Sequence, residues 1–390
     1  VTAAMNRGLR DDPTLRAKFA MTLSDEMMAR EEWFVKTLGH PLNPRSPLQM
    51  KRLFYEDLAQ KVIINRKTGA PTLDDDALDT IGKREPLLRP LLRRINEHRS
   101  LGVFLSTFVN AKVDVDRRIR CSFNIAGTES FRLSSSQNAF GSGLNLQNVP
   151  PGGVTERDNP HALVLPNVRQ LFIPDEGCEI FDMDLDRADL QVVVWEADDE
   201  ELREMLREGV DLHTENARLL GVSRQLAKIW VHGTNYGGGP RTMAINCGLT
   251  LHVAEKMQRL WFAAHPGIHR WHRRVEESLR TKRAVANAFG YRRFYFDRIE
   301  GILPEALAWI PQSTVARVIN GIWWRIAAEA PEIQVLVQVH DSLVGQYARD
   351  DSKRMREKLA SLSRIVVPYP TPLVIPVGIK TSQNSWGDCK

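Results

Sequence analysis

Residues 335–345 read VLVQVHDSLVG, a run of aliphatic side chains interrupted by one carboxylate, Asp341. The valines and leucines on both sides of it favour a buried β-strand. A buried carboxylate costs free energy unless a cation or hydrogen-bond donors compensate its charge. The position of Asp341, between His340 and Ser342, therefore predicts a cationic partner in the fold.

A second acidic strand is predicted at residues 178–186, CEIFDMDLD. Strand alternation places Asp182, Asp184 and Asp186 on one face. Taken alone, this face is either a solvated sheet edge or a metal site. Together with Asp341 it favours the metal site, because magnesium takes a few protein carboxylates and leaves its other positions to water and phosphate. Two such ions about 4 Å apart can assist phosphoryl transfer.

The segment 223–243, SRQLAKIWVHGTNYGGGPRTM, carries cations at helical spacing, and Ser223 can cap the helix. Arg224, Lys228 and His232 are four residues apart and Tyr236 follows at the next step, so they form one stripe. Such a stripe suits a nucleoside triphosphate, with the phosphates on the cations and the base or sugar against the ring. A solvated basic helix face has the same pattern. Upstream, His213 is either a further phosphate-binding group or an ordinary structural histidine.

The bulk composition is that of a folded protein of two or three structural units, since the chain has 390 residues. Its formal net charge of +5 allows a polyanionic partner. The four cysteines form no CxxC pair, so neither a zinc site nor a disulfide framework is expected. There is no apolar stretch of membrane-spanning length and no signal peptide, so a cytoplasmic protein without a membrane partner is expected.

The three segments together resemble the polymerase motifs of DNA polymerase family A, the group of bacterial DNA polymerase I and its phage and organellar relatives. FDMDLDRADLQVVVWEADDEEL resembles motif A, RQLAKIWVHGTNYGG resembles motif B, and VQVHDSLVG resembles motif C. Further matches are FRLSSS and NLQNVP between 131 and 150, LHTENARLLGV, FGYRRF, NPRSPLQMKRLF and KTGAPT. The matches follow the family's order over nearly the whole chain.

The resemblance implies an α+β fold with the right-hand architecture of polymerases. Residues 1–110 would form the thumb and 201–298 the helical fingers. Residues 111–200 and 299–390 would form the palm, an antiparallel sheet with helices. The implied activity is template-directed addition of dNTPs to a primer 3′-hydroxyl by a monomer whose partners are primer–template DNA and dNTPs. A bacterial or phage-infected cell is the expected source, and an organellar origin is left open.

The resemblance also implies the site residues. Asp184 and Asp341 map onto the catalytic aspartates, and the backbone carbonyl of Leu185 adds a ligand for two Mg²⁺ ions, with Mn²⁺ as a substitute. Residues implied to hold the triphosphate, or to lie beside its base, are Arg224, Lys228, His213 and Tyr236. Residues implied to contact primer or template DNA are Arg132, Asn145, Gln147, Asn148, Gln338 and His340. Further candidate cations of the DNA groove are Arg292, Arg293, Arg89, Arg93, Arg94 and Arg99.

Three positions depart from the family pattern. The sugar-selecting glutamate is Asp189 here, which puts exclusion of ribonucleotides in doubt because the side chain is one methylene shorter. The ring of motif B is His232, and the acidic residue after the motif C aspartate is Ser342. His232 and Ser342 favour a rival hypothesis, a primer–template-binding accessory subunit with impaired catalysis. The intact aspartates and the Arg224–Lys228 pair favour an enzyme.

Two further functions are weighed from the sequence. The proofreading motifs of the family would lie before residue 1, so this chain is expected to lack 3′→5′ exonuclease activity, which an upstream region would supply. A hydrolase relay of Ser342, His340 and Asp341 is rejected, because neighbours on a strand point to opposite faces.

Overall fold

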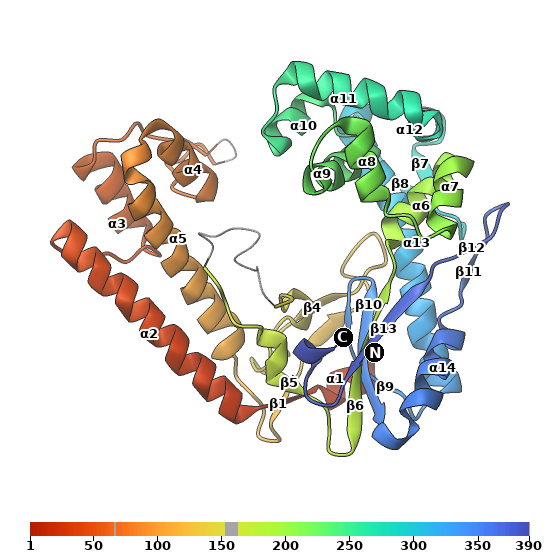
Figure 1. Cartoon of the computed structure of the whole chain (residues 1–390), viewed down its shortest axis with the longest axis horizontal. Helices are drawn as coiled ribbons and strands as arrows, with labels where there is room; N and C mark the ends of the chain where they lie inside the picture. The colour runs from red at the N-terminus through yellow and green to blue at the C-terminus, as the bar shows by residue number, and fades with distance from the viewer. Residues whose placement is uncertain (66–67, 153–162, 390) are drawn as a thin grey trace.

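The computed structural model describes residues 1–65, 68–152 and 163–389, and Lys67 of the KTGAPT segment lies outside the described residues (Figure 1). Two helical groups rise from a central region that holds a four-stranded sheet (Figure 1). Every strand pair among the described residues is antiparallel. The predicted α+β class is therefore confirmed.

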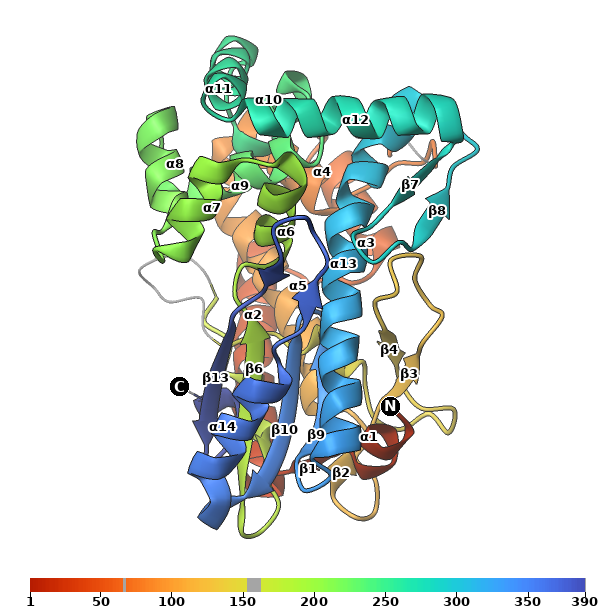
Figure 2. The same cartoon turned by 90° about the vertical axis from the view of Figure 1, so that its right-hand side faces the viewer.

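The central sheet has the strand order β13–β6–β10–β9. Its strands are β6 (Cys178–Leu185), β9 (Gln334–Val339), β10 (Ser342–Ala348) and β13 (Val377–Ser382). The acidic strand β6 thus lies inside the sheet, and the alternative of a sheet edge is wrong. Two helices, α13 (Ile299–Glu329) and α14 (Ser352–Leu362), pack against the sheet (Figure 2). The stacked rings of Phe181 and Tyr347, 5.7 Å apart, lie in the core beneath it.

The run 335–345 is a hairpin, not one strand. Val339 pairs with Ser342, so His340 and Asp341 form a two-residue turn between β9 and β10. His340 has a φ of 56°, a conformation that tight hairpin turns require and that glycine or asparagine usually supplies. The absence of these residues concealed the turn in the sequence. Asp341 therefore lies at the end of the sheet, half-buried, instead of inside a strand.

The turn also changes why a serine hydrolase is excluded. The strand-alternation reason does not apply, because two of the three residues are in the turn. Instead, the Ser342 hydroxyl donates to the Val339 carbonyl at 3.1 Å. The hydroxyl is thus engaged with the backbone, and no Ser–His relay is formed.

The first helical group, residues 13–109, is called the N-terminal arm. It contains α2 (Pro13–Leu38), α3 (Pro47–Lys51), α4 (Asp75–Arg84) and α5 (Arg89–Phe104), with π-helical turns at Arg52–Asp57 and Leu105–Val109. Ser46 caps α3 and Pro47 is its first residue. The outer part of the arm has its own core, which includes Phe34, Met50 and Ile95.

The residues before the arm belong with the rest of the molecule. Helix α1 (Thr2–Arg7) packs against β9, and β1 (Leu9–Asp11) pairs with β2 (Arg118–Ile119) and β5 (Phe172–Ile173). Ala4 and Leu9 lie in the same core as the central sheet. The sequence did not separate these residues from the rest of 1–110, because a six-residue helix and a three-residue strand give no signal of their partners, and the 1–110 unit stays a prediction.

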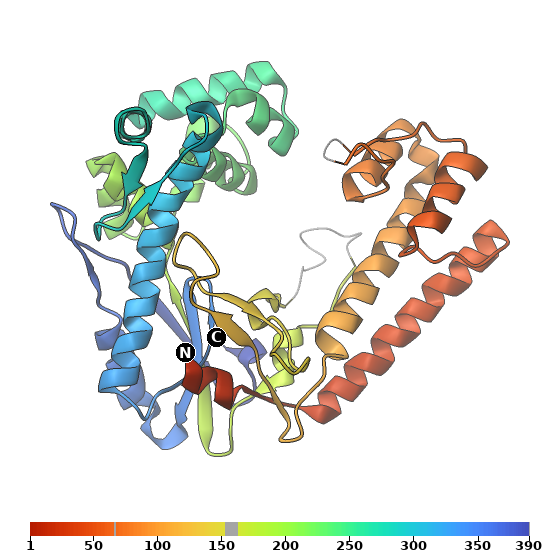
Figure 3. The same ribbon diagram turned by 180° about the vertical axis from the view of Figure 1, so that it is seen from behind.

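The second helical group, residues 188–282, is called the upper group (Figure 1). Its helices are α6 (Ala188–Ala197), α7 (Glu200–Arg207), α8 (Leu212–Leu220), α9 (Arg224–Asn235), α10 (Pro240–Cys247), α11 (Leu251–Ala264) and α12 (Pro266–Lys282). Two hairpins flank α13: β7 (Ala284–Ala286) with β8 (Arg292–Phe294), and β3 (Ser122–Asn124) with β4 (Ser134–Ser136) (Figure 3). A small pair, β11 (Val366–Val367) and β12 (Leu373–Val374), completes the strands described. No helix in the described ranges is long and apolar enough to span a bilayer.

Candidate active site

Asp184 and Asp341 meet at one end of the central sheet. Asp184 of β6 is directly opposite Ser342 of β10. The amide of Leu185 donates to the carbonyl of Asp341, with an N–O distance of 3.2 Å. Backbone pairing thus brings together two aspartates that are far apart in the sequence, as predicted for a shared site.

The carboxylates of this pair are hard to ionise. The Asp184 side chain is exposed, but nearby protein atoms still displace part of the water around its carboxylate. This partial burial and the neighbouring carboxylates, Asp341 first among them, raise the pKa of Asp184 to about 7, although the Lys380 ammonium opposes them. Partial burial and the carboxylate of Asp189 also raise the pKa of Asp341. A cation at this place would relieve the repulsion.

The donor set fits a divalent cation with few protein ligands. In the described part of the chain, the Asp184 carboxylate has no hydrogen-bond partner and no ion pair. No cluster of three or more His, Cys, Asp or Glu side chains that could hold a metal occurs within residues 1–65, 68–152 and 163–389. Magnesium needs no such cluster, because water and substrate oxygens complete its shell.

Two other aspartates, Asp182 of β6 and Asp186 just after it, form interactions with other side chains. Asp182 accepts a hydrogen bond from the indole of Trp386 at 2.8 Å and lies 3.5 Å from the Arg169 guanidinium. Asp186 pairs with Arg187 at 2.8 Å. Of these three aspartates, only Asp184 has a carboxylate without a hydrogen bond or ion pair in the described part of the chain. Trp386 and Arg169 were not found from the sequence, because they lie far from β6 along the chain.

One cavity of about 570 Å³ extends from Asp341 to helix α9, and Asp184 does not line it. Ser223 caps this helix, as predicted. Lys228 and His232 line the cavity from α9, facing Asp341 at the end of the sheet. The remaining predicted residues in its lining are Asp189 and His213. The cavity therefore combines carboxylates at one end with cations and an imidazole at the other.

Arg224 lies at the exposed start of α9 and does not line this cavity. Its guanidinium donates to both carboxylate oxygens of Asp211, at 2.8 and 3.3 Å. This pairing holds the pKa of Asp211 below its usual range. Phosphate binding by Arg224 would require it to exchange Asp211 for the phosphate, and it stays a prediction.

Asp189 connects three predicted residues. Its carboxylate accepts from the Tyr236 hydroxyl at 3.2 Å and lies 3.5 Å from the Arg132 guanidinium. Burial and the charge of Asp189 raise the pKa of Tyr236. The ring of His232 meets that of Tyr236 edge-on, with 4.6 Å between centroids. Asp189 and His232, two of the departures from the family pattern, thus line the same cavity.

His213 of α8 is a partly buried base of the cavity. Burial first, and then the charges of Lys228 and Arg224, lower its pKa. Its Nδ1 is buried and has no hydrogen-bond partner among the described residues. The ring is therefore neutral at neutral pH, and an anion in the cavity would favour its protonation.

The comparison with protein families shows to which family a chain with these residues belongs. The model of "DNA polymerase family A" matches residues 14–388. The chain belongs to DNA polymerase family A. Among its family A relatives, thermostable DNA polymerase I of Thermus filiformis is 26% identical over 96% of this chain, and DNA polymerase I of Geobacillus stearothermophilus is 24% identical over 94%. The chain spans about half the length of these relatives, 45% and 43%.

A solved family A structure shares the fold. It is the POL domain of Pol1 from M. smegmatis, in complex with DNA primer-template and dNTP. The TM-score is 0.81 at 23% sequence identity, and the match covers 97% of this chain and 67% of that chain. The architecture described above is therefore that of a family A polymerase domain.

Two of the residues predicted from the family pattern to contact DNA are buried. Gln147 is 8% exposed and donates to the Leu133 carbonyl at 3.1 Å. Gln338 is 1% exposed and donates to the Asn320 side chain at 3.1 Å. The side-chain nitrogens of both glutamines are thus used inside the protein, whereas Oε1 of Gln338 has no hydrogen-bond partner among the described residues, so both DNA contacts stay predictions. A sequence motif gives the type of a polar residue but not its burial.

The other predicted DNA contacts of this region divide into engaged and free side chains. The Asn145 side chain accepts a hydrogen bond from the backbone N–H of Gln147 at 3.1 Å, so it caps a short turn. Asn148 and His340 are exposed, and their side chains have no hydrogen-bond partner in the described ranges. The DNA contacts of Asn148, His340 and Arg132 stay predictions.

The two arginines of FGYRRF differ. Arg293 is ion-paired with Glu129 and Glu305 and stacks over the Tyr295 ring at 4.6 Å. Its charge is compensated by these two glutamates, and DNA binding by Arg293 stays a prediction. Arg292 is exposed without an ion pair among the described residues and stays a candidate.

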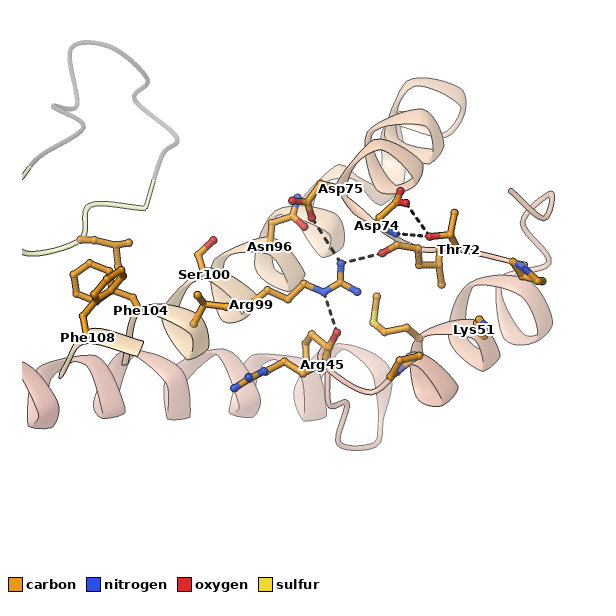
Figure 4. Close-up of a pocket in the computed structure, with 17 residues that line it drawn as sticks. Arg45, Lys51, Thr72, Asp74, Asp75, Asn96, Arg99, Ser100, Phe104 and Phe108 are labelled. Atoms are coloured by element: carbon orange, nitrogen blue, oxygen red, sulfur yellow. Dashed lines mark hydrogen bonds and ion pairs between the residues drawn. The ribbon is translucent and has the colours of Figure 1, made fainter. Parts of the chain in front are cut away.

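The predicted arginines of the arm mostly bind other groups of the protein. Arg99 donates to the carbonyls of Pro44 and Leu73, at 2.9 and 3.0 Å, and so ties two loops together (Figure 4). Arg93 and Arg94 pair with one glutamate, Glu97, and Arg89 donates to the Gly82 carbonyl at 3.2 Å. The sequence did not predict these contacts within the protein, because the spacing of arginines along a helix does not show which groups lie near them.

A cavity of about 910 Å³ lies beside Arg99 in the arm. Arg45 and Lys51 line it, and neither side chain has an ion pair in the described part of the chain (Figure 4). These two cations are better candidates for phosphate contacts than Arg99, and the sequence did not single them out.

Proposed function

We propose that this chain is the polymerase region of a DNA-directed DNA polymerase, which adds dNTPs to a primer 3′-hydroxyl under the direction of a template. The observation that carries the proposal is the cavity that Asp341 and Lys228 of α9 line together, with Asp184 beside Asp341 at the same end of the sheet. Carboxylates for metal ions opposite a cation for phosphates are what phosphoryl transfer requires. Membership of family A supports the same assignment.

In this proposal the arm, residues 13–109, is the thumb, and the upper group is the fingers. The central sheet with α13, α14 and the strands around β1 is the palm. The duplex would lie between thumb and fingers, with Arg45, Lys51 and Arg292 near its phosphates. Binding should weaken with salt, because such cations release counterions from the DNA.

Asp184, Asp341 and the Leu185 carbonyl would hold two Mg²⁺ ions, with Mn²⁺ as a substitute. When bound, these ions would lower the pKa of the primer 3′-hydroxyl and neutralise triphosphate oxygens. Side chains of the protein supply the remaining contacts with the triphosphate. Lys228 binds the triphosphate and stabilises the leaving pyrophosphate, Arg224 joins it after release from Asp211, and His213 accepts a proton as the anion arrives.

The test is primer extension by the Asp341→Ala variant, with Asp350→Ala as the matched control. Asp350 is exposed near the end of β10, away from the cavity. Asp341→Ala should lose extension by at least about a thousandfold while binding primer–template with nearly unchanged Kd, because positioning of the reacting oxygens is lost and the DNA contacts are kept. Normal extension by Asp341→Ala would refute the assignment.

The same assay separates the rival hypothesis. A wild-type chain that binds primer–template tightly but never extends it, with Mg²⁺ or Mn²⁺, would be an accessory subunit with impaired catalysis. The expected absence of proofreading is tested with a mismatched primer and no dNTPs, where shortening of the primer would disprove it.

A further inference from the structure

Arg187 has an unusual place between the sheet and the upper group. It follows the aspartates of β6 and directly precedes α6, with φ 47° and ψ 39°. A long side chain in this left-handed region is uncommon and is kept where surrounding contacts over-determine it. Here the contacts are those of the guanidinium, which fixes the side chain against the loop before α8.

The guanidinium is held on two sides. It donates from Nη1 to the Val210 carbonyl at 2.9 Å and from Nη2 to Asp186 at 2.8 Å, and its Nε also faces Asp186. An arginine has five N–H groups, two on each terminal nitrogen. These bonds use one N–H of each terminal nitrogen, so one N–H on each remains for a ligand.

Arg187 lines the same cavity as Lys228 and His213. Its charge, after burial and the charges of Lys228 and Arg224, also lowers the pKa of His213. Arg224 pairs with Asp211 at the exposed start of α9 and does not line the cavity, whereas Lys228 and Arg187 line it, although Arg187 also pairs with Asp186. Arg187 comes from the segment between β6 and α6, and Lys228 comes from α9.

We propose that Arg187 is a further triphosphate-binding residue, which contacts phosphate oxygens from the sheet side while Lys228 contacts them from α9. This inference rests on the proposed function, because it places the dNTP in this cavity. Val210 and Asp186 position the guanidinium in advance, so little side-chain freedom is lost on binding. Arg187 thus binds the triphosphate whatever the base and sugar.

The experiment compares Arg187→Gln and Arg187→Lys with wild type. Loss of one charge-assisted contact to a phosphate should raise the KM for every dNTP roughly ten- to hundredfold. The inhibition constant of inorganic pyrophosphate should rise by a similar factor, while the Kd for primer–template stays within about twofold. Arg187→Lys should recover part of the loss. Arg207→Gln, which removes an exposed arginine of α7 paired with Glu200, is the control.

Unchanged KM and pyrophosphate inhibition in Arg187→Gln would overturn the inference, as would a fall in kcat alone that follows a lower Tm. A larger loss of DNA affinity than of dNTP affinity would assign Arg187 to the DNA instead. Calorimetric titration with magnesium pyrophosphate decides the point even for a chain that does not extend primers. In that case the proposed function fails, and the phosphate contact is judged by itself.

Discussion

Replacement of Asp184 by asparagine should stabilise the metal-free protein above neutral pH although it destroys the site. The unfolded chain ionises this carboxyl near its ordinary pKa of 3.8, whereas in the folded protein the pKa is about 7. Between these values the folded state binds more protons, so the free energy of unfolding falls as the pH rises from about 4 to about 7. Asparagine cannot ionise and escapes this loss.

The magnitude follows from the shift of the pKa. A change from 3.8 to about 7 corresponds to at most about 4 kcal/mol. Because Asp184 is open to solvent on one side, screening reduces the expected gain to about 1–2 kcal/mol. For 390 residues, an unfolding entropy of roughly 2.1 cal/mol/K per residue converts this to a Tm increase of about 1–3 °C.

The assay is thermal unfolding in EDTA at pH 4 and pH 8, with Asp350→Asn as the control. Asp184→Asn should match wild type at pH 4, unfold at the higher temperature at pH 8, and gain nothing from added Mg²⁺. Wild type should gain stability from Mg²⁺ at pH 8, because a ligand of the folded state stabilises it. A Tm of Asp184→Asn at or below that of wild type at pH 8 in EDTA would refute the account of mutual repulsion.

Three further outcomes are expected. Asp189→Glu should raise the preference for dNTPs over rNTPs roughly tenfold in kcat/KM, since one added methylene fills the space near Tyr236, and an unchanged ratio would remove Asp189 as a sugar gate. Gly345→Ala should lower the free energy of unfolding by about 2 kcal/mol, because a Cβ would lie 2.5 Å from the Gln334 carbonyl oxygen and from the Phe181 ring. Gly378→Ala on β13, where a Cβ meets nothing within 4 Å, should be neutral in the same denaturation assay. Arg99→Gln should destabilise the arm by about 1–3 kcal/mol with little change in DNA affinity, while a weaker and less salt-dependent binding at unchanged Tm would show that Arg99 contacts phosphate.

Several features could be predicted because they are local. The caps at Ser46 and Ser223, and the helical stripe with Lys228 and His232, depend on residues a few positions apart. Local spacing fixes which side chains share a helix face, whatever the rest of the chain does. The resemblance to family A rested on such local motifs in a fixed order, and the family match over residues 14–388 confirms it.

The turn at His340 and Asp341 shows the limit of local patterns. The valines on both sides predict strand, and the sequence has no glycine or asparagine to mark the turn. Only the pairing of β10 with both β6 and β9 shows that Asp341 lies at the end of the sheet beside Leu185. Pairing with a distant strand outweighed the weak local preference.

The sequence by itself determined the chemistry available to this protein: which residues are acidic, which are basic, and which stripe each helix presents. The tertiary structure decided which of them are free to act. Asp184 keeps an unpaired carboxylate while Asp182 is bound by Trp386, and Arg187 reaches the cavity while Arg99 and Arg293 are consumed by internal contacts. The physical reason is that a charged group is satisfied by whatever partner the fold brings near it, and that partner lies anywhere in the chain.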